Sequence, residues 1–140
     1  MSYEEKGEIL AVLHAYAKPR AKERPRFNRS TGTAFTPATT KKAEKEQQSM
    51  FLGAWGKNRA PIPTDVPLRL YFQFFISKPK TVTREFPTVR PDVDNMVKLT
   101  LDAMIGPILE DDGNVIDIIA EKRYADKDYI KVTIVRAQHG

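Results

Sequence analysis

The stretch PLRLYFQFFI, from Pro67 to Ile76, alternates between two sets of side chains. One set is entirely apolar and comprises Leu68, Leu70, Phe72, Phe74 and Ile76. The other comprises Arg69, Tyr71, Gln73 and Phe75. Successive side chains of a strand point to opposite faces, so a period of two residues is typical of a strand with one buried face. We therefore expect a β-strand here.

Two elements are predicted before this strand. Ile9 to Ala15 is short and apolar and is followed by Lys18-Pro19, which predicts a first strand ended by a turn. Thr36-Pro37 precedes a stretch of residues that favour helix, so a first helix is expected from Ala38 to Trp55. Lys18 to Thr36 lies between them and is basic and poor in apolar residues, which predicts an exposed loop.

Three further elements are predicted after it. A Pro- and Thr-rich loop from Lys78 to Pro91 leads to Asp94, a natural cap for a helix from about Asn95 to Ile105. Gly106-Pro107 ends that helix. Val115 to Lys122 and Tyr129 to Val135 then read as two strands around a turn, which predicts an antiparallel hairpin.

The element order is therefore β-α-β-α-β-β, which predicts an α/β (α+β) fold with a mixed sheet and two main helices. A chain of 140 residues is the length of one domain, so we expect a single domain over 1–140 with a short N-terminal extension, 1–8. Lys and Arg outnumber Asp and Glu by 23 to 18, which favours a polyanionic partner without naming one.

The composition also limits the possible metal ligands and the expected location of the protein. There is no cysteine, so any metal site has to use oxygen or imidazole ligands. No apolar run reaches the roughly 18 residues of a membrane span, and the first residues lack the pattern of a signal peptide. We expect a cytoplasmic protein with no membrane segment and no nucleotide cofactor.

Acidic residues gather in RPDVDNMVK, residues 90–98, and in EDDGN, residues 110–114. The helix between these motifs carries Asp94, Lys98 and Asp102 on one face, and its other positions are largely apolar. An ordinary ion-paired stripe is one interpretation of this face, since acids and bases four residues apart are common. Gathered carboxylates repel one another unless a cation neutralises them, and oxygen ligands select Mg²⁺ or Mn²⁺. Such an ion suits phosphodiester hydrolysis.

A calcium-binding EF-hand loop is the competing interpretation of Asp112-Gly113-Asn114, and its spacing excludes it. Placing Gly113 at the sixth loop position puts Ile108 at the first and Ile119 at the twelfth, where acidic residues are required.

The string from Arg90 to Lys98, followed by LDAM at 101–104 and LEDD at 109–112, resembles the RusA family of Holliday junction resolvases. The resemblance implies catalytic roles for Asp92, Asp94, Lys98 and Asp112. The three aspartates are then the metal ligands, with Asp111 a secondary one. Upstream, Pro19, Lys22, RPRF at 24–27 and FTP at 35–37 are similar to phage-borne members.

The family resemblance implies a Mg²⁺-dependent endonuclease that resolves four-way DNA junctions by paired, symmetric nicks in recombination and repair, with Mn²⁺ as a substitute. A nuclease for other branched DNA, such as flaps or forks, and a non-catalytic binder of branched DNA are the alternatives. Binding alone explains the acidic motifs poorly, because carboxylates gain nothing from facing phosphates.

Basic residues of the loop and of the first helix are the expected DNA contacts, with a merely solvated loop as the alternative. They are Arg20, Lys22, Arg24, Arg26, Arg29, Lys41 and Lys42. Phe27, Phe35, Tyr71 and Trp55 are able to stack on bases, but core packing explains them as well, so they receive no role.

Two nicks in opposed strands need two sites, so the symmetry of the junction predicts a homodimer. Candidate interface residues are Tyr71 and Phe75 on the second face of the strand, and Phe51 and Trp55 on the first helix. Core packing explains these residues equally well.

Overall fold

A computed structural model describes residues 7–138 and has the predicted class, a small mixed sheet with two helices. The elements are β1 (Gly7–Ala15), β2 (Arg26–Asn28), β3 (Thr33–Phe35), α1 (Ala38–Trp55), β4 (Leu68–Ser77), α2 (Val93–Met104), β5 (Val115–Ala125) and β6 (Tyr129–Ala137). Residues 1–6 of the predicted N-terminal extension lie outside the described range, and its last two, Gly7 and Glu8, belong to β1. No helix within residues 7–138 is long and apolar enough to cross a membrane.

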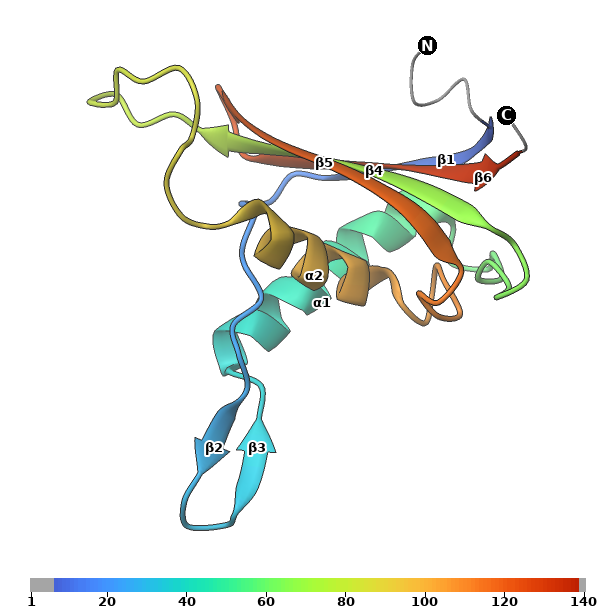
Figure 1. Ribbon diagram of the computed structural model, residues 1–140, viewed down its shortest axis with the longest axis horizontal. Coiled ribbons are helices and arrows are strands. Elements are labelled where there is room, and N and C mark those ends of the chain that lie inside the picture. The colour runs from blue at the N-terminus through green and yellow to red at the C-terminus, as the bar shows by residue number, and fades with distance from the viewer. Residues whose placement is uncertain (1–6, 139–140) are drawn as a thin grey trace.

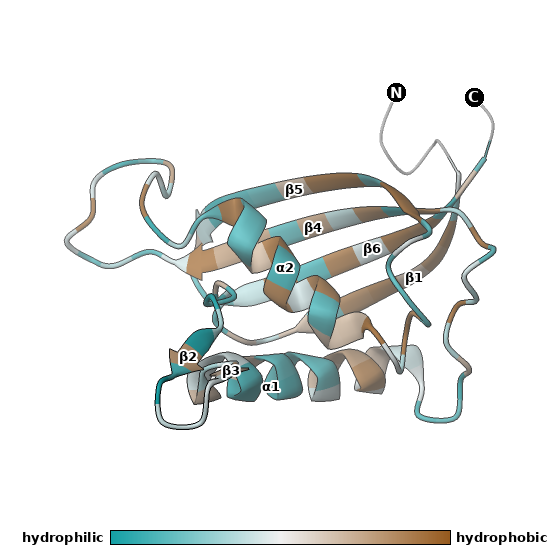
Figure 2. Cartoon of the chain, turned by 60° about the horizontal axis from the view of Figure 1, so that its bottom comes forward, coloured by the Kyte–Doolittle hydropathy of each residue, from teal (hydrophilic) through white to brown (hydrophobic). Residues whose placement is uncertain are grey.

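The core lies between the four-stranded sheet and the two helices, which cover the same face of it (Figure 1). The alternation in β4 is confirmed, because Leu68, Leu70, Phe72 and Phe74 are buried on the helix side. Figure 2 views this side and shows α2 lying across the strands. From α1, Phe51 and Trp55 are buried in the core, so neither forms a dimer interface as predicted.

The order of strands in the sheet is β1-β6-β4-β5, and it corrects the predicted hairpin. β5 pairs with β4 in parallel, joined to it by α2, while β6 lies on the other side of β4 and is antiparallel to both β4 and β1. The connection from β5 to β6 therefore passes over the end of β4, where the Ser77 amide donates to the Asp128 carboxylate at 2.9 Å. A short polar connection between two alternating segments has the same sequence pattern whether it joins neighbours or skips one strand.

Residues 23–35 of the predicted basic loop are exposed, but Pro19 is buried and Lys22 is partly buried. The loop also contains the hairpin of β2 and β3, which the sequence prediction missed. Its strands have three residues each and neither face is buried, so no apolar periodicity marks them.

Candidate active site at the start of α2

Asp92 and Asp94 lie at the start of α2, but the helix begins earlier than predicted. Asp92, not Asp94, occupies the N-cap position, and its carbonyl accepts from the Met96 amide at 3.2 Å. Both aspartates are acceptable cap residues, so composition alone does not choose between them. The Asp92 side chain makes no capping hydrogen bond, and Asp94 falls in the first helical turn.

These two carboxylates open onto a pocket of about 480 Å³ lined by Lys22, Glu23, Arg24, Pro25, Asp92, Asp94, Asn95 and Lys98. Asp92 and Asp94 are exposed, and neither side chain forms a hydrogen bond or an ion pair with any residue between 7 and 138. Their charges are favoured by the positive end of the helix dipole and by the basic residues around the pocket. Two unpaired carboxylates in one concave site are available to bind an external cation.

Lys98 lies one helical turn after Asp94 and lines the same pocket. Its side chain is exposed and makes no ion pair with a described residue. The interpretation of Asp94, Lys98 and Asp102 as an ion-paired stripe therefore does not explain the position of Lys98. Asp102, the last member of the stripe, pairs with Lys22 instead.

Lys22 was predicted to contact DNA phosphates, but in the structure its ammonium is held by two carboxylates of the chain. Its ammonium pairs with Asp102 and, at 3.2 Å, with Glu44, and its backbone amide donates to the Asn95 carbonyl at 3.0 Å. Burial acts to lower the pKa of Lys22, but the hydrogen bonds and charges of Asp102 and Glu44 outweigh it, so the pKa is raised. Lys22 thus fastens the segment before the β2–β3 hairpin to both helices.

Replacing Lys22 by methionine is expected to lower the free energy of unfolding at neutral pH by about 1 kcal/mol, the value of a partly exposed ion pair. Because the folded-state pKa is raised, this contribution is complete below the unfolded value of 10.5 and is lost as pH rises through the folded value. Urea unfolding of both proteins at neutral and at strongly alkaline pH measures it. A stability difference that persists at high pH would show that the ion pairs are not its source.

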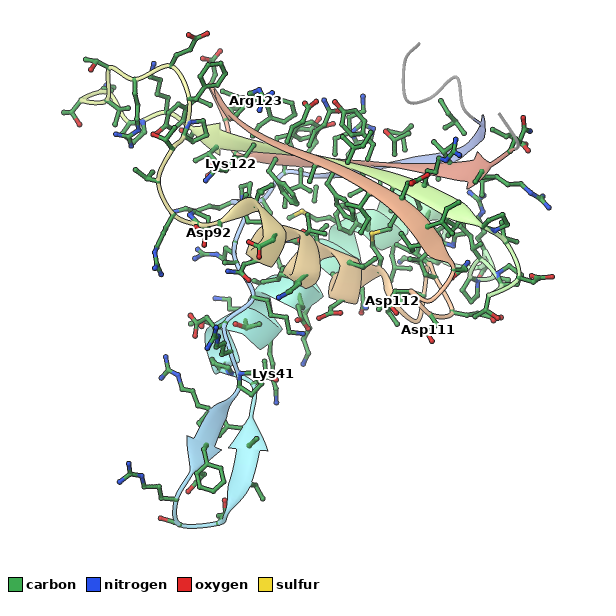
Figure 3. All side chains as sticks on the ribbon, viewed as in Figure 1. Lys41, Asp92, Asp111, Asp112, Lys122 and Arg123 are labelled. Atoms are coloured by element: carbon green, nitrogen blue, oxygen red, sulfur yellow. The ribbon has the colours of Figure 1, made fainter. Side chains whose placement is uncertain are left out.

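Asp111 and Asp112 lie at the opposite end of α2 from Asp92 (Figure 3). A helix of 12 residues is about 18 Å long, so the two acidic motifs are separated by the length of α2. Both residues are exposed, and the Asp111 side chain accepts from the Asp112 amide at 2.8 Å. Among residues 7–138 no three acidic or histidine side chains are close enough to hold one metal ion. Within residues 7–138, Asp112 is therefore not grouped with Asp92 and Asp94.

Comparison with protein families matches residues 17–135 to the family model "Endodeoxyribonuclease RusA". The chain belongs to the RusA family. Its matched part includes the hairpin, both helices and both acidic motifs of this RusA-family chain. "Uncharacterized protein YqaN" of Bacillus subtilis (strain 168) is 42% identical over 48 residues, which is 34% of each of the two chains.

RusA-family nucleases are metal-dependent in general, and the residues at the start of α2 fit a hard cation. Mg²⁺ takes one or two protein carboxylates and fills its other positions with water and substrate phosphates. Asp92 and Asp94 provide such a pair beside an open pocket, with the Asn95 side chain next to them. Within residues 7–138, Asp112 does not join Asp92 and Asp94 in a group that could hold a metal ion.

Lys122 is a residue of this RusA-family chain that the sequence analysis missed. Its ammonium donates to the carbonyls of Val89 and Pro91, at 2.7 and 2.9 Å, and so holds the segment that leads into Asp92 (Figure 3). In the register of β5, Lys122 has the same parity as Ala120, which packs against the core. A lysine at an inward strand position is the signal that could have identified it.

Proposed function

We propose that this protein is a Mg²⁺-dependent, structure-selective endonuclease that resolves four-way DNA junctions, with Mn²⁺ as an effective substitute. The observation that carries the proposal is that Asp92, Asp94 and Lys98 of a RusA-family chain share one open pocket and that their side chains form no ion pair with any residue between 7 and 138. Neither a binding module nor a structural ion pair needs this arrangement.

In this proposal Asp92 and Asp94 hold the ion. When bound, the ion supplies Lewis-acid activation of a phosphate and of the attacking water. Lys98 places its ammonium beside the same phosphate and stabilises the charge that develops on it. Arg24, also on the pocket wall, binds a neighbouring phosphate and holds the strand in register.

The separation of Asp112 from the pocket supports a homodimer whose sites are shared between chains. β5 is an edge strand with an open backbone edge, and Ile116 and Ile118 on it are 57% and 47% exposed. Long apolar edge strands are templates for pairing with another chain. This edge is a better candidate interface than Phe51 and Trp55.

Antiparallel pairing of two β5 strands about a two-fold axis would bring the separated acidic motifs together. Asp112 precedes the start of β5, while Lys122, near its end, contacts Pro91 next to Asp92. Val115 and Lys122 are about 23 Å apart along the strand. In the pair, the start of each strand lies beside the end of the other, so one chain's Asp112 approaches the other chain's Asp92.

Mixed dimers test this sharing. Asp94→Asn and Asp112→Asn chains, carrying different tags and purified together, are each expected to be inactive alone. In a shared-site dimer one site then receives both substitutions and the other receives neither, so the mixed dimer should nick a single strand. A mixed dimer as inactive as its parents would show that each chain supplies a complete site or that the interface lies elsewhere.

A substrate panel tests the proposed activity itself. Labelled four-way junction, flap and linear duplex are incubated with the protein, with Mg²⁺ and with EDTA. Cleavage of the junction alone, only with metal, is the expected result. Preferential cleavage of the flap favours a nuclease for other branched DNA, and junction binding without any cleavage favours the non-catalytic binder; either outcome overturns the proposal.

The arginines between β1 and the turn of the β2–β3 hairpin support DNA binding. Removing them should make the affinity for DNA less dependent on salt concentration. Arg20, Arg24 and Arg29 are exposed and make no ion pair with a described residue, whereas Arg26 pairs with Glu23 at 3.6 Å. Replacing the three unpaired arginines by glutamine should reduce the log–log slope of affinity against salt by roughly 0.9 for each phosphate that the variant no longer neutralises. Lys57→Gln, beyond the other end of α1, is the matched control. An unchanged slope in the triple variant would show that this segment faces away from DNA.

A further inference from the structure

The β2–β3 hairpin projects from the body of the protein beyond the start of α1 and away from the four-stranded sheet (Figure 1). Every residue from Glu23 to Phe35 is exposed, so the hairpin rests on no part of the core. A two-stranded ribbon of this size is only marginally stable in water. An exposed ribbon beside the candidate active site is placed to contact a partner outside the chain.

Two large aromatic side chains of this hairpin face solvent, with Phe27 65% exposed and Phe35 45% exposed. The register pairs Arg26 with Phe35 and Phe27 with Ala34. Directly opposed residues in a ribbon share a face, and the next pair along lies on the other face. Phe27 and Phe35 therefore lie on opposite faces of the ribbon, one aromatic ring on each.

The turn of the hairpin is held in a defined shape. The Asn28 side-chain oxygen accepts from the amides of Ser30 and Thr31, at 2.9 and 3.3 Å, and the Asn28 carbonyl accepts from the Gly32 amide at 2.8 Å. Gly32 has a φ of 71°, which glycine adopts without strain. These bonds order the turn before binding, so placing the tip against a partner costs less conformational entropy.

The base of the hairpin is part of the active-site pocket. Lys22 to Pro25, which lead into β2, line that pocket together with Asp92, Asp94 and Lys98. Lys22 is fastened to α1 and α2 by its ion pairs, so the direction in which the hairpin leaves the body is fixed. A DNA strand whose phosphate lies at the aspartates passes next to the hairpin.

The partner that fits this ribbon is an opened DNA branch point. Arg24, Arg26 and Arg29 give the segment a basic character that suits a polyanion. Bases stack on aromatic side chains, and at a branch point the last base pairs of two arms present free stacking faces. A ribbon bound in a groove presents one face to the DNA, whereas a ribbon between two arms needs an aromatic ring on each face, as found here.

We propose that the hairpin is a wedge that enters the branch point, with Phe27 stacked on the terminal base pair of one arm and Phe35 on that of the next. The proposal rests on the proposed function, because it needs a branched substrate at the aspartates. It gives the hairpin a separate task, which is to hold the crossover open so that the scissile phosphate reaches the pocket.

Permanganate oxidation of thymines at the branch point tests the wedge, because only unstacked thymines react. Binding is measured in an Asp94→Asn background, in which the DNA stays intact. The chain with both phenylalanines should make the branch-point thymines reactive. Phe27→Ala/Phe35→Ala should leave them protected and weaken junction binding roughly tenfold or more, the effect of losing a stacked base, with duplex binding unchanged.

Phe86→Ala is the matched control, because Phe86 is 49% exposed and lies outside the hairpin. Phe27→Leu/Phe35→Leu keeps the apolar volume without the rings and should also lose thymine reactivity. Cleavage is compared separately, in chains that keep Asp94. If the wild-type chain cuts junctions, and Phe27→Ala/Phe35→Ala cuts them at the same rate and opens them equally in the Asp94→Asn background, the wedge is wrong while the proposed function stands. Equal losses on junction and duplex would also overturn it. A wild-type chain that cuts no junction refutes the proposed function instead.

Discussion

Asp94→Asn is expected to abolish junction cleavage while leaving junction binding intact or tighter. The substitution removes a charge from the pocket without changing the volume of the side chain, so a metal ligand is removed and the fold is kept. Tighter binding is expected because an unneutralised carboxylate beside the pocket repels phosphates. Asp92→Asn and Asp112→Asn should have the same effect, because the proposed dimer brings one chain's Asp112 to the other chain's Asp92 and Asp94. Single-turnover cleavage and a gel-shift titration on the same junction measure both quantities.

Asp65→Asn is the control for this series, because Asp65 is an exposed loop acid outside the pocket. It should cut at the wild-type rate. Loss of binding in parallel with loss of cleavage in the Asp94 variant would indicate a structural role and contradict the assignment as a metal ligand. Activity of the wild type that survives excess EDTA would contradict it independently.

Lys98→Ala is expected to slow cleavage by at least about 10²-fold with little change in stability, since a positioned charge at a transferring phosphate is worth several kcal/mol. Lys98 makes no ion pair with a described residue, so its removal takes no ion pair away from the folded chain. Lys57→Ala provides the comparison for a surface lysine outside the pocket. A small rate loss together with a lower unfolding midpoint would mark Lys98 as a structural residue.

The parts of the fold predicted from sequence are those with a strong local period. β4 has its alternation and α1 its run of helix formers, and both were placed within a residue or two of their bounds. The β5–β6 pairing was wrong because neighbours in sequence are separated by β4 in the sheet. Pairing between strands is a property of the whole chain that a local pattern does not encode.

The candidate site also has features that the local sequence predicts and features that depend on tertiary structure. Asp92, Asp94 and Lys98 share one pocket because they lie within two helical turns of each other, so their spacing in sequence was sufficient. The distance to Asp112 was also available from the sequence, because the helix predicted between the two motifs already separates its ends by roughly 16 Å. The contacts of Lys122 with the Val89 and Pro91 carbonyls depend on tertiary structure, so its inward position in β5 marks the residue but not its partners.

Cleavage of a supercoiled plasmid that extrudes a cruciform tests the central claim most directly, because the products distinguish paired from single nicks. With Mg²⁺ the protein should convert the plasmid to linear DNA cut symmetrically across the cruciform base, and with EDTA it should leave the plasmid supercoiled. Nicked circles as the only product, equal cleavage of a plasmid without the cruciform, or cleavage without metal would contradict a Mg²⁺-dependent junction resolvase.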